Sequence, residues 1–137
     1  MPILNTDAEL RSLLENAHSI AVVGLSDKPD RDSYRVARYL LHAGYTIIPV
    51  NPAVHEVFNI PALPDLDSIK IPVDIVDIFR RAEVVPEVIE AAIRIRAGAV
   101  WMQFGAYHAA ASQRASAARL SVVPDRCIMI EHHRLIR

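Results

Sequence analysis

The stretch SIAVVGLSDKPDRDSYRVA, residues 19–37, decides the fold class of this 137-residue chain. Its first five residues form a nearly continuous apolar run, which is typical of a strand buried on both faces. A polar loop follows at 26–32, and Ser33 can then cap a helix that ends near Ala43. A buried strand, a polar loop and a helix in this order begin a parallel α/β unit.

The same alternation continues along the chain. Further strands are expected at residues 46–50, 73–79, 99–103 and 121–123, and further helices at about 84–96, 107–119 and 127–135. Thr6 and Glu9 have the spacing of a capping box, which predicts a helix within residues 1–18. Residues 53–71 hold several prolines and are expected to form turns or a short helix, and Pro49 is awkward for a central strand. We therefore expect one domain spanning 1–137, a Rossmann-like, doubly wound, mainly parallel five-stranded sheet with helices on both faces.

Composition excludes several classes of protein. A net charge of −1 gives no basic surface for nucleic acid. No apolar run approaches the roughly 20 residues of a membrane span, and the first residues lack the pattern of a secretion signal. Cys127 is the single cysteine, so an internal disulfide is excluded and a reducing compartment is favoured. We expect a cytoplasmic protein that binds neither nucleic acid nor membrane.

The loop after the first strand is a candidate anion site. In parallel sheets, ligands bind at the carboxyl ends of the strands, where strand order reverses. The free N–H groups at the start of the following helix favour a phosphate. The loop adds hydroxyl and cationic groups from Ser26, Lys28, Arg31 and Ser33. Three aspartates in the same loop offset these cations, so a solvated turn is the alternative.

The dinucleotide fingerprint is absent from this loop. Gly24 is the only glycine before Gly44, so a G-x-G-x-x-G motif cannot be written here. The second strand also ends in Asn51-Pro52 and not in the acid that would bind an NAD ribose. These absences weaken a third functional alternative, an NAD(P)-binding redox sensor.

Several motifs together resemble the small stand-alone CoA-binding proteins of the YccU-like group. The resemblance extends from about residue 19 to 134 and lies in residues 21–26, 32–37, 48–52, 73–81, 100–103 and 125–128. These proteins are similar to the CoA-binding domain of the succinyl-CoA synthetase α subunit. The resemblance implies a Rossmann-like module that binds coenzyme A and lacks the catalytic centre of the synthetase.

Carried over by position, the resemblance assigns a set of residues to the cofactor. Ser26 and Lys28 would meet phosphate close to Gly24, and Ser33, Tyr34 and Arg35 would lie at the start of the helix, beside Arg31 of the loop. Asn51 and Pro52 would border the adenosine, and Phe79 with Arg80 or Arg81 would lie at the exit of the third strand.

The pair Arg80-Arg81 could clamp the 3′-phosphate or the diphosphate of the cofactor through bidentate hydrogen bonds. The alternative is an exposed pair that bonds Glu83 and Glu87. The sequence does not decide which arginine faces the ligand.

Cys127 is a candidate partner for the thiol of CoA, because a mixed disulfide could join the two. Arg126 next to it could lower the pKa of the thiol and raise its reactivity. The more common role of a single cysteine is that of a small buried hydrophobic residue. The adjacent His132 and His133 miss the spacing of a metal-binding pair, and no metal is expected.

Two aspartates lie in the expected third strand. Asp74 and Asp77 are an odd number of residues apart and should face opposite sides of the sheet, so they are not expected to form an acid/base pair. Asp77 is expected to order a loop or to cap a neighbouring backbone group.

Two functional hypotheses follow. The first is a non-catalytic CoA-binding module with a sensor, carrier or regulatory role. The second is an enzyme that acts on CoA or acyl-CoA through Cys127 and a nearby histidine. A homodimer and an unidentified protein partner both stay open.

Overall fold

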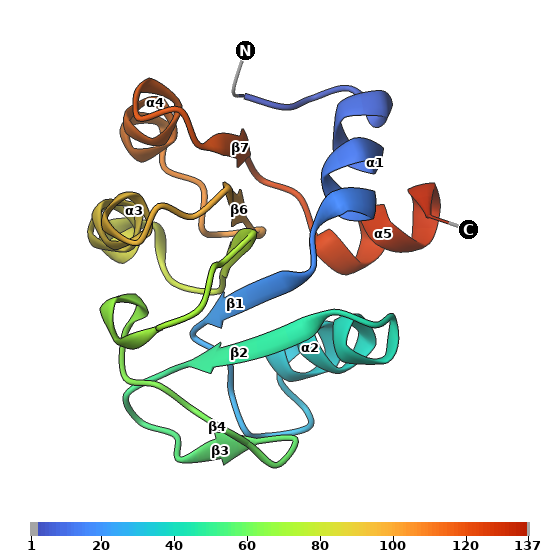
Figure 1. The fold of residues 1–137 in the computed structure, drawn as a ribbon, viewed down its shortest axis with the longest axis vertical. Helices are drawn as coiled ribbons and strands as arrows, with labels where there is room; N and C mark the ends of the chain where they lie inside the picture. Colours follow the sequence, from blue (N-terminus) through green and yellow to red (C-terminus); the bar gives the residue numbers. More distant parts are fainter. Residues whose placement is uncertain (1–2, 137) are drawn as a thin grey trace.

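The computed structural model describes residues 3–136 and places five parallel strands between two layers of helices (Figure 1). The helices are α1 (Asp7–Asn16), α2 (Asp32–His42), α3 (Val85–Arg94), α4 (Ala109–Ala117) and α5 (Ile128–Leu135). The strands of the main sheet are β1 (Ser19–Val23), β2 (Thr46–Val50), β5 (Ile75–Ile78), β6 (Ala99–Met102) and β7 (Ser121–Val123). These elements confirm the predicted Rossmann-like class, with ends that differ from the expected ranges by a few residues.

The strand order β2-β1-β5-β6-β7 determines where a ligand can bind. The chain leaves β1 toward β2 on one side and later returns to form β5 on the other side of β1. The direction of winding therefore reverses between β1 and β5. The carboxyl ends of these two strands, next to Val23 and Ile78, form the crevice that parallel sheets use for ligands.

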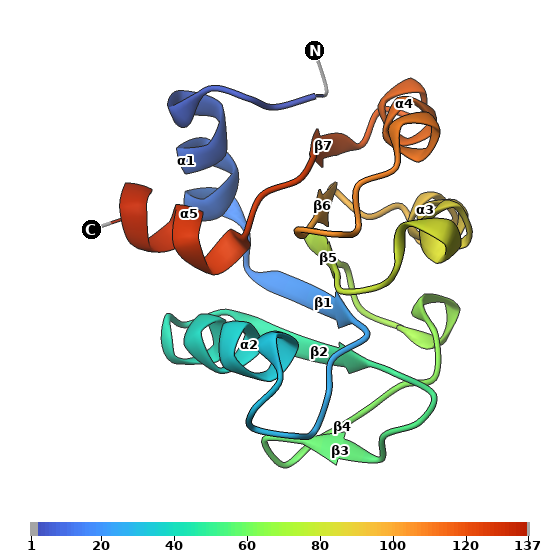
Figure 2. The ribbon, with the colours of Figure 1, turned by 180° about the vertical axis from the view of Figure 1, so that it is seen from behind.

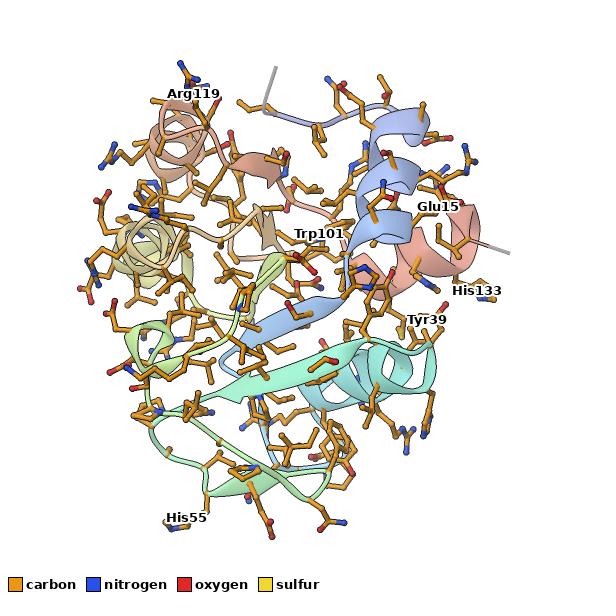
Figure 3. All side chains as sticks on the ribbon, viewed as in Figure 1. Glu15, Tyr39, His55, Trp101, Arg119 and His133 are labelled. Carbon is orange, nitrogen blue, oxygen red and sulfur yellow. The ribbon has the colours of Figure 1, made fainter. Side chains whose placement is uncertain are left out.

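Each face of the sheet has its own helical layer, as Figures 1 and 2 show from opposite sides. One face packs against α1, α2 and α5, with Leu10, Leu40 and Ile128 fully buried. The other face packs against α3 and α4 through residues such as Ile89 and Ala115. Trp101 lies deep in the first layer, and its indole Nε1 donates to the carbonyl of Arg126 at 2.8 Å (Figure 3).

Pro49 fits because β2 is the edge strand of the main sheet. It pairs with Val22 on one side only. On the other side, the N–H of Leu63 donates to the carbonyl of Pro49 at 2.9 Å. An edge strand tolerates proline, which cannot donate to a second neighbour.

The prediction for residues 53–71 was wrong in one respect. A short antiparallel hairpin forms there from β3 (Glu56–Val57) and β4 (Ile60–Pro61), followed by a 3₁₀ turn at Leu66–Ser68. Phe58 and Asn59 make the turn with positive φ angles of 56° and 62°. Two consecutive left-handed residues are typical of a tight hairpin turn, and strands of two residues leave no alternating pattern in the sequence.

None of the helices within residues 3–136 is long and apolar enough to cross a membrane.

Candidate functional site

Gly24 joins the exits of β1 and β5. Its φ of +87° lies in the left-handed region, and a Cβ atom at this position would lie 2.2 Å from the carbonyl oxygen of Phe79. The two chains can therefore approach this closely only because residue 24 has no side chain. The N–H of Gly24 donates to the carbonyl of Val50 at 2.8 Å, and the N–H of Phe79 donates to that of Val23 at 2.9 Å. The exits of β2, β1 and β5 are thus bonded into one edge.

The loop between β1 and α2 is braced by its own polar side chains. The N–H of Ser26 donates to Ser33 Oγ at 3.0 Å, and the N–H of Lys28 donates to Ser26 Oγ at 3.0 Å. Asn51 Nδ2 donates to the carbonyl of Leu25 at 3.0 Å, which ties the loop to the end of β2. The polar residues of this loop therefore define its shape.

Helix α2 begins two residues earlier than a cap at Ser33 would place it, and Ser33 does not cap it. The N-cap is Arg31, whose side chain forms no capping hydrogen bond, and Ser33 lies buried inside the first turn. Among the residues that the structure describes, no side-chain acceptor caps this helix start. Its N–H groups and the positive end of its dipole therefore face the loop.

A central hollow of about 390 Å³ lies at the start of α2. The cations on its wall are Arg31, Arg80 and Arg81. Asp32 also lines it, and its carboxylate pairs with Arg35 of the same helix. Three guanidinium groups and an uncapped helix start outweigh one paired carboxylate, so the central hollow favours an anion.

Two further hollows share walls with the central hollow. The β2-side hollow, of about 320 Å³, shares Arg80 and is lined by Val50, Pro52 and Leu66 among others. The α5-side hollow, of about 270 Å³, shares Asp32, Phe79 and Phe104 with the central hollow and is otherwise lined by Arg35, Val36, Gln103, Cys127, Met129 and Ile130. The three hollows together form a trough along the carboxyl edge of the sheet.

A larger hollow, of about 570 Å³, lies between α1 and the opposite edge of the sheet. Its wall includes the acidic residues Glu9 and Asp74 and no lysine or arginine. An anion is therefore disfavoured there, although the space is greater.

A family model described as CoA binding domain matches residues 18–133. The chain belongs to this CoA-binding family. A protein of Bacillus subtilis (strain 168), named Uncharacterized protein YneT, is 41% identical over 125 residues, which are 91% of this chain and 93% of that protein.

Solved structures share the fold of this chain. A hypothetical protein from Pyrococcus horikoshii OT3 is 39% identical with a TM-score of 0.94, and the match covers 97% of this chain and 94% of that one. An acetyl-coenzyme A synthetase 1 from Ca. Korarchaeum cryptofilum is 22% identical with a TM-score of 0.72. That match covers 82% of this chain and 27% of the synthetase, and at this identity it shows the shared fold alone.

Most of the residues predicted for the CoA site line the central hollow: Gly24, Ser26, Arg31, Ser33, Phe79, Arg80 and Arg81. Both arginines of the pair reach it, and Arg80 borders the β2-side hollow as well. Within residues 3–136, neither forms an ion pair with Glu83 or Glu87. The structure thus brings both arginines to the wall of one hollow.

Other predicted residues have different surroundings. Lys28 is exposed on the loop and is absent from the described walls of the three hollows. Tyr34 packs on Phe58 of the hairpin, with ring centroids 4.7 Å apart. Arg35 lines the α5-side hollow, and its Nη1 donates to the carbonyl of Asp30 at 2.8 Å.

The residues at the end of β2 have separate positions. Asn51 uses both ends of its amide on the backbone, because its Oδ1 accepts from the N–H of Ala53 at 2.9 Å. Pro52 lines the β2-side hollow.

Cys127 is buried at the N-cap of α5 and lines the α5-side hollow. Its neighbours in sequence have partners of their own. Arg126 pairs with Glu131 at 3.0 Å, and His132 Nδ1 shares a hydrogen bond of 2.8 Å with the hydroxyl of Tyr39. Burial lowers the pKa of His132.

The prediction for Asp77 was wrong. The residue is fully buried in β5, and neither carboxylate oxygen has a hydrogen-bond partner among the described residues. Asp77 therefore orders no loop and caps no backbone group. Burial raises the pKa of this carboxyl well above its ordinary value, so the neutral acid is the favoured form. Asp74 instead accepts from the N–H groups of His18 and Ser19 at 2.7 and 3.1 Å, before β5 begins.

Sequence reasoning missed the residues that follow β6 and those that begin α5. Gln103, Phe104 and Gly105 line the trough, as do Met129 and Ile130. The rule that ligands bind at the carboxyl ends of parallel strands would have pointed to the first three, because Gln103 ends a predicted strand and the other two directly follow it. Nothing in the sequence indicated that α5 returns to this edge. Among residues 3–136, no group of three His, Cys, Asp or Glu side chains could hold a metal ion.

Proposed function

We propose that this protein is a non-catalytic module that binds coenzyme A with the diphosphate in the central hollow. The observation that carries the proposal is the convergence of Arg31, Arg80 and Arg81 on the uncapped start of α2. Guanidinium groups bind phosphate through paired, charge-assisted hydrogen bonds, and the helix start adds N–H donors. Gly24 supports this arrangement because it keeps the two strand exits close enough to share one anion.

The trough suits a ligand with three chemically different parts. The β2-side hollow has apolar walls from Val50, Pro52 and Leu66, which suit the adenine ring. Arg80 lies between this hollow and the central one, where it can meet the 3′-phosphate or the diphosphate. The α5-side hollow then remains for the pantetheine arm.

A nicotinamide dinucleotide fits less well. The end of β2 provides Asn51, whose amide is already bonded to the carbonyl of Leu25 and to the N–H of Ala53. No carboxylate stands at that position to accept from the two ribose hydroxyls, as NAD sites require. CoA carries a phosphate on this ribose, and a cation such as Arg80 suits it.

The walls of the central hollow favour binding without chemistry. Ser33 Oγ accepts from the loop backbone, and among the described lining residues no histidine or cysteine stands beside a hydroxyl to activate it. A sensor, carrier or regulatory role follows from binding alone.

Calorimetric titration with CoA, dephospho-CoA and NAD tests the proposal. We expect CoA to bind at least tenfold more tightly than dephospho-CoA, because a charge-assisted hydrogen bond contributes about 1.5–3 kcal/mol. Absence of heat with CoA, or tighter binding of NAD, would refute it.

The position of Cys127 favours a second candidate, a thiol chemistry on the bound cofactor. In this scheme the Cys127 thiolate attacks the sulfur of a CoA disulfide, a protein–CoA mixed disulfide forms, and the other CoA leaves as a thiolate. Such a step would make the protein an enzyme or a redox sensor. Mass spectrometry after incubation with CoA disulfide tests it, and an unmodified Cys127 would exclude this candidate.

A further inference from the structure

Gln103 is a buried amide with one end in use. The residue is 4% exposed, and its Oε1 accepts from the N–H of Ile128, the first residue of α5, at 3.0 Å. This bond fixes the orientation of the amide, because only the oxygen can accept. Its Nε2 has no hydrogen-bond partner among residues 3–136. Among these residues, the fully enclosed side-chain atoms without a partner are the two oxygens of Asp77, so Nε2 of Gln103 is not fully enclosed. Since Gln103 lines the α5-side hollow, its free N–H₂ group faces that hollow.

Most of the other residues that line the α5-side hollow are apolar. Val36, Phe79, Met129 and Ile130 form its walls, together with Phe104. Its charged residues, Asp32 and Arg35, bond each other. Its volume of about 270 Å³ is below the roughly 300–1,000 Å³ of pockets for whole drug-sized ligands, so it suits one end of a larger molecule. One directed donor among apolar walls selects an apolar chain that carries a carbonyl group.

We propose that the α5-side hollow binds the acyl end of a short-chain acyl-CoA, with Gln103 Nε2 donating to the thioester carbonyl. This inference rests on the proposed binding of CoA in the central hollow. The arm is placed toward α5 because the α5-side hollow holds the unpartnered amide donor, whereas the β2-side hollow has the apolar wall assigned to the adenine ring. The acyl chain then lies against Met129 and Ile130.

The test compares CoA, acetyl-CoA and butyryl-CoA by calorimetry on the full chain at pH 8. Butyryl-CoA should bind about tenfold more tightly than acetyl-CoA, because two more CH₂ groups are buried. The variant Gln103→Glu keeps an oxygen for the N–H of Ile128 and loses the donor. It should weaken butyryl-CoA about tenfold and change CoA by less than about threefold.

A matched pair of serine variants tests the apolar wall independently of Gln103. Ile130→Ser should reduce the preference for butyryl-CoA over CoA by about fivefold. Ile71→Ser is the control, because Ile71 is similarly exposed, at 53% against 49%, and is absent from the described walls of the trough. Thermal unfolding of each variant shows whether the fold is kept.

The outcomes separate this inference from the proposed function. Equal affinity for CoA and the acyl-CoAs, or an equal loss for both in Gln103→Glu, would overturn the assignment of the thioester site while leaving CoA binding intact. If Gln103→Glu fails to fold, equal behaviour of the two serine variants would overturn it. No binding of CoA itself would refute the proposed function instead.

Discussion

Asp77→Asn should make the stability of this protein much less dependent on pH. The carboxyl is fully buried between Val22 and Trp101 of the neighbouring strands, with no hydrogen-bond partner among the described residues. Burial raises its pKa well above the ordinary value of 3.8. The folded protein therefore keeps this proton to a higher pH than the unfolded chain does.

The sign of the effect follows from this proton. The stabilising contribution of Asp77 is complete below the unfolded pKa near 3.8, and it is lost as pH rises from there through the folded pKa. In that range the free energy of unfolding falls by about 1.4 kcal/mol per pH unit, because the folded state binds one more proton. Asparagine has a similar shape and carries no titrating proton. The advantage of Asp77→Asn over the wild type should thus grow as pH rises above 3.8, by at most about 1.4 kcal/mol per pH unit, until the folded pKa is passed.

Urea unfolding across pH 5–8 measures this difference. Asp125→Asn is the control, because Asp125 is exposed and its left-handed backbone also accepts asparagine. The two variants make the same chemical change, one at a fully buried and one at an exposed position, so their comparison isolates the effect of burial. If the difference between Asp77→Asn and the wild type does not change with pH, Asp77 is ionised or partnered in the folded protein, and the reasoning from its burial is refuted.

Three further substitutions test the site and its support. Gly24→Ala should lower the free energy of unfolding in urea by more than about 2 kcal/mol, because the added Cβ would lie 2.2 Å from a backbone oxygen. Gly44→Ala is the control: its Cβ would have no atom within 4 Å, and it should lower the free energy of unfolding by about 1 kcal/mol. Equal losses would contradict the close approach at Gly24. Arg81→Gln should weaken CoA about tenfold or more in calorimetry, because a charge-assisted bond is lost. Arg119 (Figure 3) precedes β7 and is absent from the described walls of the trough, so Arg119→Gln should leave CoA affinity unchanged. Equal losses in the two variants would remove Arg81 from the site. Thr6→Ala should lower the free energy of unfolding by about 1 kcal/mol, because it removes the N-cap bond that Thr6 Oγ1 accepts from the N–H of Glu9 at 3.2 Å. An unchanged midpoint of urea unfolding would contradict a stabilising cap.

Several features that depend on neighbouring residues alone could be predicted from the sequence, although the cap at Ser33 could not. The apolar run of β1 and the capping box at Thr6 depend on neighbouring residues, and both were predicted correctly. The hairpin turn at Phe58 and Asn59 was missed, because its residues differ from the glycine-containing pairs that mark such turns.

Other features depend on distant parts of the chain. The alternation rule placed Asp77 on the side of the strand opposite to Asp74, but it could not show that α2 and α5 would cover that side and exclude every partner. Gln103 was missed for a similar reason, because its role depends on the N–H of Ile128, 25 residues later.

The candidate site separates residues that shape the loop from residues that are left for a ligand. The side chains of Ser26, Ser33 and Asn51 form hydrogen bonds with the backbone. These residues of the motif therefore hold the loop in shape, whether or not they also contact a ligand. Arg80 and Arg81 form no side-chain hydrogen bond with residues 3–136, yet they line the same hollow. A loop that is already braced needs little reordering when an anion binds, so more of the electrostatic attraction remains as affinity. In this motif, the serines and the asparagine therefore hold the shape of the hollow, and the arginines provide the positive charge that would bind an anion.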